Sequence, residues 1–470
     1  MANIVFLQRL YCEYGGPTII SAVLKNAGHK VSVFIGEKST FFLHRIKNKD
    51  IVAFSVMSGL HNWAITIASE IKRKRDVLTV FGGPHPTYFP EIINHHAVDV
   101  VCLGEGEYPM LDLANALDRN LDISKIPNLW VKKYGTIYKN EIRPLIDNLD
   151  TLPFPDRDLY YSTYPYLKND LLKTFKVARG CPYRCSFCFN PTLQDMYRGK
   201  GKYTRFRSPQ NIIREINEVR DKYGLKKVLF YDDVFILNKE WLRDFLCLYK
   251  KEILIPFSCD ARVDTLDEEI IIMLKEAGCF CLRFGIESGN EKIRNGILKK
   301  EISDDNIINI VRVLKKHKLK FLTYNMVGIP EETLDDIYQT IDLNVKIRTD
   351  YPRCSLLTPY PGTEIARYAA EKGMLEVSTD KIFASFQQYQ SIIKSDHKNE
   401  IINLHLFFQT AVIFPRTRGL INKLIFIPTN ILFRIWWAIV YFFIYMKSEG
   451  RRFWHTFVFA LRISNALFEK

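Results

Sequence analysis

Short apolar runs alternate with amphipathic stretches along the first 140 residues. The runs predict strands at NIVFLQ (3–8), KVSVFIG (30–36), IVAFSVMS (51–58) and VLTVFGG (77–83), and helices are predicted between them, for example over 16–29 and 61–75. Continuously apolar strands separated by helices indicate a parallel sheet covered on both faces. We therefore expect an α/β fold, with a doubly wound, flavodoxin-like domain over residues 1–141.

Residues 142–170 interrupt this pattern with four prolines, which predict an extended linker. The alternation resumes over residues 171–375. Six further strands are predicted at TFKVAR (174–179), KVLFYDD (227–233), IPFSCDAR (255–262), FCLRFGIES (280–288), KFLTYNMVGIP (320–330) and RCSLLTPYPG (353–362). The helices between them begin near residues suited to N-caps, namely Ser208, Asn238, Asp267, Ser303 and Thr333. Six such units predict a partial (β/α)6 barrel, with function at the carboxyl ends of its strands.

The last part of the chain, residues 376–470, is more apolar and aromatic than the rest. The stretch 424–446 has the length of a membrane span, but Pro428, Asn430 and Arg434 interrupt it. Only 435–446 is unbroken, and that run is too short to cross a bilayer. We expect a helical region that either lies shallowly at a membrane surface or packs as a cap on the barrel.

Composition and charge narrow the class of protein. The chain has 470 residues, 47% of them hydrophobic and 25% charged, which is typical of a globular protein. Half of the net charge of +14 arises beyond residue 411. No basic module of a known nucleic-acid-binding type accompanies that charge, so we expect no nucleic-acid partner. Ten cysteines are too few for a disulfide scaffold, and we expect a cytoplasmic protein, with the inner face of the membrane as a peripheral site.

Three cysteines gather in the segment ARGCPYRCSFCFNP (178–191). Cys181, Cys185 and Cys188 have the spacing C-x3-C-x2-C, and the next cysteine is Cys247. A zinc site or a redox-only iron–sulfur protein would need a fourth ligand, and none follows at a suitable spacing. Three thiolates on a 4Fe–4S cube instead leave one iron open to a ligand. Cys279 and Cys281 are expected to share one strand face, either as buried structural thiols or at a second cluster.

The cysteine segment, with Arg179-Gly180 before it and Phe187 within it, resembles the signature of radical S-adenosylmethionine (SAM) enzymes. The motifs FYDDVF, CDARVD, FGIESG, NMVGIPEET and TPYPGT follow in the order that the family shows. The resemblance implies a 4Fe–4S cluster on the three cysteines and SAM on its open iron. It also implies SAM contacts for residues of the first four motifs: Asp232, Asp233, Arg262, Glu287, Ser288 and Gly328.

The first domain is similar to the cobalamin-binding domain of one large radical SAM subfamily, through VFGGPHPTYFPE (80–91) and VCLGEGE (101–107). The resemblance implies a corrin near Ser55, Ser58, Gly82 and Gly83. The D-x-H-x-x-G motif that supplies a histidine to cobalt in other cobalamin proteins is absent, so a domain of this shape that binds no corrin is the alternative.

These resemblances imply an enzyme that functionalises an unactivated carbon, with cobalamin-dependent methyl transfer as the expected reaction. Radical cyclisation or carbon–carbon coupling is the alternative within the family. A methylthiotransferase would need an N-terminal cysteine trio, whereas residues 1–140 contain only Cys12 and Cys102. We expect a small-molecule or lipid-like substrate and an external low-potential electron donor.

Overall fold

The computed structural model describes residues 1–376 and 390–467. Its N-terminal sheet has the order β2-β1-β3-β4-β5-β6-β7. The first five strands in chain order are parallel: β1 (Asn3–Gln8), β2 (Lys30–Ile35), β3 (Ile51–Ser55), β4 (Leu78–Gly82) and β5 (Val100–Cys102). The helices are α1 (Gly15–Asn26), α2 (Ser39–Leu43), α3 (His61–Lys72), α4 (Pro84–Tyr88) and α5 (Glu107–Asp118). The order of the parallel strands is that of a flavodoxin-like sheet, as expected.

Both faces of this sheet are covered by helices. On β1, Ile4 and Phe6 belong to the core under α1 and α5, whereas Val5 and Leu7 belong to the core under α3. Successive strand residues point to opposite faces, which explains why the run is apolar at every position. The antiparallel hairpin of β6 (Leu129–Lys133) and β7 (Thr136–Lys139), which was not predicted, extends the sheet at one edge.

The segment that joins the two sheets is not simply extended. It contains two short helices, α6 (Asp158–Tyr161) and α7 (Pro165–Asn169). The Tyr160 hydroxyl donates to Oε1 of Gln8 over 2.6 Å, and Tyr160 is buried in the N-terminal core. This aromatic anchoring gives the proline-rich segment a fixed path against the first domain.

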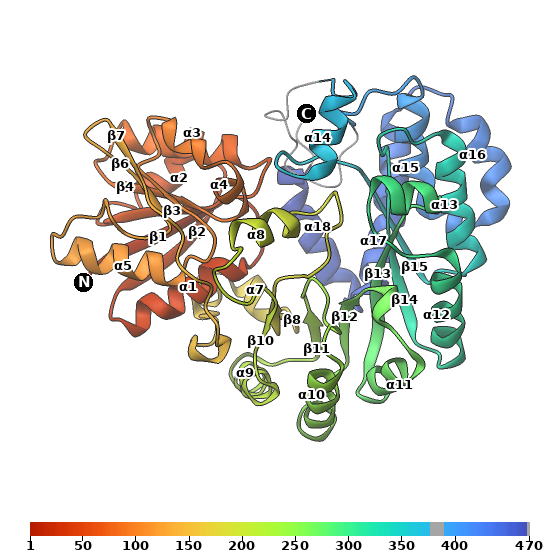
Figure 1. Cartoon of the computed structure of the whole chain (residues 1–470), viewed down its shortest axis with the longest axis horizontal. Helices are drawn as coiled ribbons and strands as arrows, with labels where there is room; N and C mark the ends of the chain where they lie inside the picture. Colours follow the sequence, from red (N-terminus) through yellow and green to blue (C-terminus); the bar gives the residue numbers. More distant parts are fainter. Residues whose placement is uncertain (377–389, 468–470) are drawn as a thin grey trace.

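The second sheet is parallel and has six strands in the order β15-β14-β13-β12-β11-β8. These are β8 (Leu172–Phe175), β11 (Lys227–Phe230), β12 (Phe257–Ala261), β13 (Cys279–Glu287), β14 (Lys320–Val327) and β15 (Tyr351–Leu356). The helices are α9 (Pro209–Tyr223), α10 (Lys239–Glu252), α11 (Glu268–Glu276), α12 (Asp304–Lys316), α13 (Leu334–Lys346) and α14 (Glu364–Glu371). No pairing joins β8 to β15 among the described residues, so the barrel is open between them (Figure 1).

The predicted N-caps of the barrel helices are confirmed. The side chains of Ser208, Asn238, Asp267, Ser303 and Thr333 each accept a hydrogen bond from a backbone N–H of the first helical turn. Each bond satisfies a donor that has no partner inside the helix, so these local residues set where the helices begin.

One prediction about β13 is wrong. The register between β12 and β13 shifts at Phe257 and Ser258, so that Cys279 and Cys281 face consecutive residues of β12. Cys279 packs in the outer core with Cys259, whereas Cys281 is buried outside that cluster. The irregularity inserts a residue, which breaks the two-residue alternation on which a shared face depended.

Four helices form the described part of the C-terminal region: α15 (Lys398–Ile413), α16 (Arg418–Leu424), α17 (Ile431–Ser448) and α18 (Phe453–Leu467). Residues 377–389 and 468–470 of the region predicted to be helical lie outside the described residues. Helix α15 packs on β15 and α17, and Figure 1 shows these blue helices beside the barrel sheet. By length and composition α17 could cross a membrane, and 22% of it is buried in the structure.

Candidate functional site

The three cysteines lie in the loop between β9 (Ala178–Arg179) and α8 (Asn190–Met196), after the first barrel strand. Cys181 and Cys185 are buried and Cys188 is half-buried. Burial, together with the charges of Asp233, Cys188 and Cys185, raises the pKa of the Cys181 thiol to about 12. A bound cationic cluster would instead lower the pKa of this thiol, because coordination to metal deprotonates a thiol. Within the described residues, no group of three or more His, Cys, Asp or Glu side chains is placed to hold a single ion.

Hydrogen-bond donors surround the sulfur atoms. The backbone N–H and the side-chain amide of Asn190 both donate to Sγ of Cys188 over 3.5 Å, and Nη1 of Arg262 donates to Sγ of Cys185 over 3.5 Å. Such bonds stabilise thiolates and tune the potential of an iron–sulfur cluster. The donor set therefore fits a 4Fe–4S cluster on these three cysteines.

Arg262 follows β12 and is already engaged. Its Nε and Nη2 donate to the two carboxylate oxygens of Asp264 over 2.9 and 3.0 Å, and Nη2 also donates to the Lys300 carbonyl over 2.6 Å. Its guanidinium lies 3.6 Å from the centre of the Tyr183 ring. The planar guanidinium of Arg262, which was predicted to contact SAM, is thus turned to Asp264, and its Nη1 faces the cysteine loop.

Asp232 and Asp233, after β11, have different surroundings. Asp232 is buried, and its Oδ1 accepts from the backbone N–H groups of Val177 and Ala178 over 2.9 and 2.8 Å. Burial raises the pKa of Asp232 to about 7. Asp233 is exposed, and its charge acts on both Cys181 and Cys188. Asp232 therefore fixes the chain just before the cysteine loop, while Asp233 faces that loop.

Glu287 is the last residue of β13, and Ser288 follows it. Glu287 has a positive φ of 66°, and its Oε1 accepts from Nζ of Lys300 over 2.5 Å in a buried ion pair. Ser288 is fully buried, and its carbonyl accepts from Nη1 of Arg294 over 2.8 Å. A non-glycine residue at positive φ is uncommon and marks a position that surrounding contacts hold in place.

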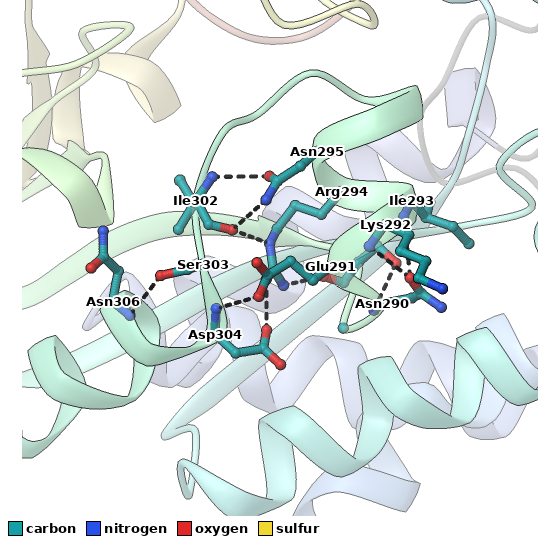
Figure 2. Close-up of polar contacts among 12 residues, drawn as sticks. Asn290, Glu291, Lys292, Ile293, Arg294, Asn295, Ile302, Ser303, Asp304 and Asn306 are labelled. Carbon is teal, nitrogen blue, oxygen red and sulfur yellow. Dashed lines mark hydrogen bonds and ion pairs between the residues drawn. The ribbon is translucent and has the colours of Figure 1, made fainter.

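Arg294 organises the loop after Ser288, as Figure 2 shows. Its side chain is fully buried, and it donates to the Ile302 carbonyl over 2.7 Å and to Oδ1 of Asp304 over 2.6 Å. Asn295 closes the same loop by accepting from the Ile302 N–H over 2.9 Å. Lys300 lies within this loop, so Arg294 also fixes the partner of Glu287.

Gly328 follows β14 at a φ of 76°, a conformation that favours glycine. Its N–H and that of Ile329 donate to Oε2 of Glu332 over 2.6 and 3.1 Å. Burial raises the pKa of Glu332 to about 8. Glu332 therefore holds the turn that follows Gly328. The sequence analysis did not single out Glu332, although it lies four residues after Gly328.

The four residues predicted to lie near a corrin come together at the carboxyl edge of the first sheet. Ser55 pairs with Gly82 across β3 and β4, and a Cβ added to Gly83 would lie 3.0 Å from the Val56 nitrogen and 3.2 Å from Oγ of Ser55. Gly83, at a φ of 92°, is thus required for close approach of the two loops. Ser58 contacts Nδ1 of His85 over 3.1 Å.

A cavity opens at the same edge, at the ends of β1 and β3. It is lined by Gln8, Arg9, Tyr14, Ser55, Leu60 and Trp63 among others. Ligands of open parallel sheets bind beyond the carboxyl ends of the strands, where the order of strands reverses, and β1 and β3 flank that point. This edge is therefore where a corrin would bind, and of the four predicted residues Ser55 lines the cavity.

The two domains meet beside the cysteine loop, through residues that sequence reasoning did not single out. Glu105, between β5 and α5, accepts from Arg179 over 2.8 Å and from Arg205 over 2.9 Å. Burial opposes ionisation of Glu105, but the hydrogen bond and charge of Arg205 and the charge of Arg179 lower its pKa. Tyr88 of α4 stacks on Phe189 of the cysteine loop with ring centres 4.2 Å apart. The carboxyl edge of the first sheet thus adjoins the cysteine loop.

Comparisons with known proteins agree with this geometry. Residues 175–343 match the family model of the Radical SAM superfamily, and residues 15–114 match that of the B12 binding domain. An uncharacterized methyltransferase of Pyrococcus horikoshii is 33% identical over 330 residues, which cover 69% of this chain and 70% of that protein. Cytidylyl-2-hydroxyethylphosphonate methyltransferase of Streptomyces wedmorensis is 22% identical over 460 residues, covering 84% and 82% of the two chains.

A solved structure has the same fold. The radical SAM methyltransferase TsrM of Kitasatospora setae, with cobalamin and a [4Fe-4S] cluster bound, superposes with a TM-score of 0.70 at 16% identity and covers 96% of this chain and all of that one. The chain belongs to the radical SAM enzymes that carry a cobalamin-binding domain. The expected fold class, the enzyme class and the three cofactors (4Fe–4S cluster, SAM and cobalamin) are confirmed.

Proposed function

We propose that this chain transfers a methyl group to an unactivated carbon of a small molecule. The observation that carries the proposal is the seam between the two domains, where Tyr88 of the corrin-binding edge stacks on Phe189 one residue after Cys188. When bound, the cluster and SAM supply a 5′-deoxyadenosyl radical, and cobalamin supplies the methyl group. A substrate held at this seam would meet both.

The chain's own residues have distinct proposed roles. Cys181, Cys185 and Cys188 hold the cluster, and Arg262 and Asn190 donate hydrogen bonds to its sulfur ligands. Asp233 is placed to accept from the SAM amino group because it is exposed and faces the cysteine loop. Asp232 acts through Val177 and Ala178 as a positioning residue.

The later barrel strands would surround the remainder of SAM. Glu287 and Ser288 close β13, and the Gly328 turn closes β14, at the edge where ligands of such barrels bind. On the other domain we assign Ser55, Ser58, Gly82 and Gly83 to the corrin, since all four lie at the carboxyl edge of the first sheet.

The partners follow from this chemistry. We infer that an external low-potential donor supplies the electron for SAM cleavage and that no nucleic acid takes part. We place the enzyme in the cytoplasm with its C-terminal region against the inner face of the membrane, where a lipid-like substrate would also be found.

Anaerobic reconstitution with iron, sulfide and hydroxocobalamin tests this function. The protein should retain a corrin through gel filtration and form 5′-deoxyadenosine from SAM with a chemical reductant. The corrin spectrum should be of the base-off form, because the loop after β1 offers no histidine. His85→Ala should leave that spectrum unchanged, since His85 already contacts Ser58. Loss of all corrin on the column would contradict the proposal.

Metabolite analysis of an expressing strain is a second test of the proposed reaction. It should find one product that is 14 mass units heavier than its precursor.

A further inference from the structure

The outer face of the C-terminal helices is strongly apolar. Fifteen of the twenty-two exposed large hydrophobic side chains in the described part of the chain lie from Ile413 onward. On α17 they form a stripe with a spacing of four residues, which places them on one helix face. The stripe consists of Ile431, Ile435, Ile439 and Phe443, which are 45–65% exposed, and Leu432 and Trp436 lie beside it.

The opposite face of α17 is already used by the fold. Trp437 and Ile444 are buried, and Tyr441 stacks on Trp437 with ring centres 4.9 Å apart. This face packs on α15 and β15. Helix α17 is therefore apolar all round but covered on one side only, and a helix of that kind needs a second apolar partner.

The neighbouring helices continue this apolar face. Phe426 and Ile427, before α17, are 64% and 44% exposed, and Trp454 and Leu461, on α18, are 71% and 56% exposed. We call the exposed apolar residues of segments 420–443 and 453–461 the outer face. Isolated exposed apolar side chains are normal on the surface of a soluble protein. An apolar face that continues over three helices is larger than such a surface usually shows.

The charges around the outer face are of one sign. Arg416, Lys423, Lys447 and Arg452 are exposed, and Lys447 continues the α17 stripe by one further turn. The one acidic residue in the described chain beyond residue 412 is Glu449, which is buried and accepts from Arg353 over 2.8 Å. An apolar face bordered by exposed cations and tryptophans is complementary to the headgroup region of an anionic bilayer.

We propose that the outer face docks in the plane of an anionic lipid bilayer. This inference deepens the membrane contact in the proposed function and rests on it. A spanning helix does not fit, because the inner side of α17 is part of the barrel: Ser448 and Glu449 both accept from Arg353 on β15. Insertion of α17 across the bilayer would carry charged barrel residues into hydrocarbon.

The same segment covers the open side of the barrel. The Gly450 carbonyl accepts from Lys227 of β11, Arg451 pairs with Asp170, and the His455 carbonyl accepts from Tyr166 over 2.8 Å. These contacts join the end of α17 and the start of α18 to the β8 side of the gap, while Arg353 holds Glu449 on the β15 side. Docking would thus place lipid next to the gap between β8 and β15, where a lipid-like substrate would enter.

Flotation of the full-length holoenzyme with vesicles tests the inference. Vesicles of phosphatidylcholine with 40% phosphatidylglycerol should carry the protein upward at low salt, and vesicles of phosphatidylcholine alone should carry at least tenfold less. The double variant Ile435→Glu/Ile439→Glu should reduce binding to the anionic vesicles at least tenfold. The control is Leu121→Glu, which alters an equally exposed leucine of the first domain and should bind as the parent does.

Charge-reversal variants test whether the partner of the outer face is lipid or protein. Lys447→Glu/Arg452→Glu should weaken binding to anionic vesicles and leave the elution volume in gel filtration unchanged. All variants should keep the parent's melting temperature and its formation of 5′-deoxyadenosine in solution, which measures the enzyme independently of docking. The inference is overturned if the parent stays at the bottom of the gradient, if it floats equally with neutral vesicles, or if the outer-face variant converts a dimer to a monomer without changing flotation.

Discussion

Side chains at the radical SAM site either are placed to hold ligands or hold the loops in position. The residue type alone does not show which of these roles a side chain has. Asp232 and Asp233 are adjacent carboxylates, but one is buried on the backbone of residues 177–178 and the other is exposed beside the cysteines. Arg262 likewise engages Asp264 rather than standing free. At this scale the residues that hold ligands are distinguished from those that hold the loops by burial and by existing partners.

Loss of any one cysteine of the trio should abolish SAM cleavage. Cys181→Ala, Cys185→Ala or Cys188→Ala leaves a cube held by two thiolates, so iron should drop from about four per chain and 5′-deoxyadenosine should fall below about 1% of the parent. Iron analysis and chromatography of the nucleoside measure both. Cys247→Ala, at an exposed position on α10, should match the parent. Single variants that still form 5′-deoxyadenosine would disprove the assignment.

Glu332 should make stability fall as pH rises. Its folded pKa of about 8 lies above the ordinary value of 4.5. The folded state therefore binds the proton more tightly, and its contribution is complete below pH 4.5 and is lost as pH rises to about 8. In Glu332→Gln the fall in melting temperature between pH 6 and pH 8.5 should be smaller than in the parent. Glu331→Gln, at the exposed neighbour, should keep the parent's slope. Equal slopes in all three proteins would show that Glu332 does not titrate in this range.

Elements place these residues through short loops that are pinned by buried polar groups. The loop after β13 depends on Arg294, which donates to the Ile302 carbonyl and to Asp304 (Figure 2). It also donates to the Ser288 carbonyl. The turn after β14 depends in the same way on Glu332. The strand ends thus obtain their geometry from side chains further along the chain, because a short loop cannot satisfy its own buried backbone groups.

Arg294→Met should damage this loop, because one side chain serves three buried or partly buried acceptors. It would leave two buried carbonyls and the Asp304 carboxylate without their donor, at a cost of about 3 kcal/mol. We expect a lower melting temperature and at least a fivefold higher KM for SAM in 5′-deoxyadenosine formation. Arg312→Met, which removes an exposed arginine of α12 bonded to Asn309, should change neither. If the melting temperature falls while KM for SAM stays constant, the loop contributes to the fold only.

The whole molecule is organised around the contact between its two α/β domains. Glu105 joins Arg179, which begins the cysteine loop, and Arg205, which lies on the strand paired with it. Tyr88 and Phe189 stack nearby. The contact between the carboxyl edge of the first sheet and the cysteine loop therefore rests on an ion-pair network and an aromatic pair.

Glu105→Ala should loosen the domains without removing either cofactor site. Arg205 would lose its carboxylate partner and Arg179 would keep only Glu107, which we expect to cost roughly 1–3 kcal/mol. Limited proteolysis should cut the 142–157 segment at least threefold faster than in the parent, and cluster content should stay unchanged. Glu141→Ala, which removes a carboxylate that is 94% exposed, is the matched control. Proteolysis at the parent's rate would mean that the network does not hold the domains together.

The sequence by itself determined the features that depend on near neighbours. The apolar alternation defined the parallel strands of both sheets, residues such as Ser208 and Thr333 defined helix starts, and the spacing of three cysteines defined the cluster loop. Each of these rests on periodicity, capping or ligand spacing within a few residues. The resemblance of the motifs then gave the family, which the comparisons confirmed.

Only the tertiary structure decided what depends on residues far apart. Glu105 meets Arg205 across 100 positions, and Asp232 meets Val177 across 55, so no local pattern could pair them. The shifted register of β13, which separates Cys279 from Cys281, likewise arises from pairing with β12. The C-terminal region shows the same limit, because its apolar sequence allowed either a cap on the barrel or a membrane contact. Helix α17 is apolar on all sides, and the fold covers only one of them. One face of α17 therefore packs on the barrel and the other is exposed.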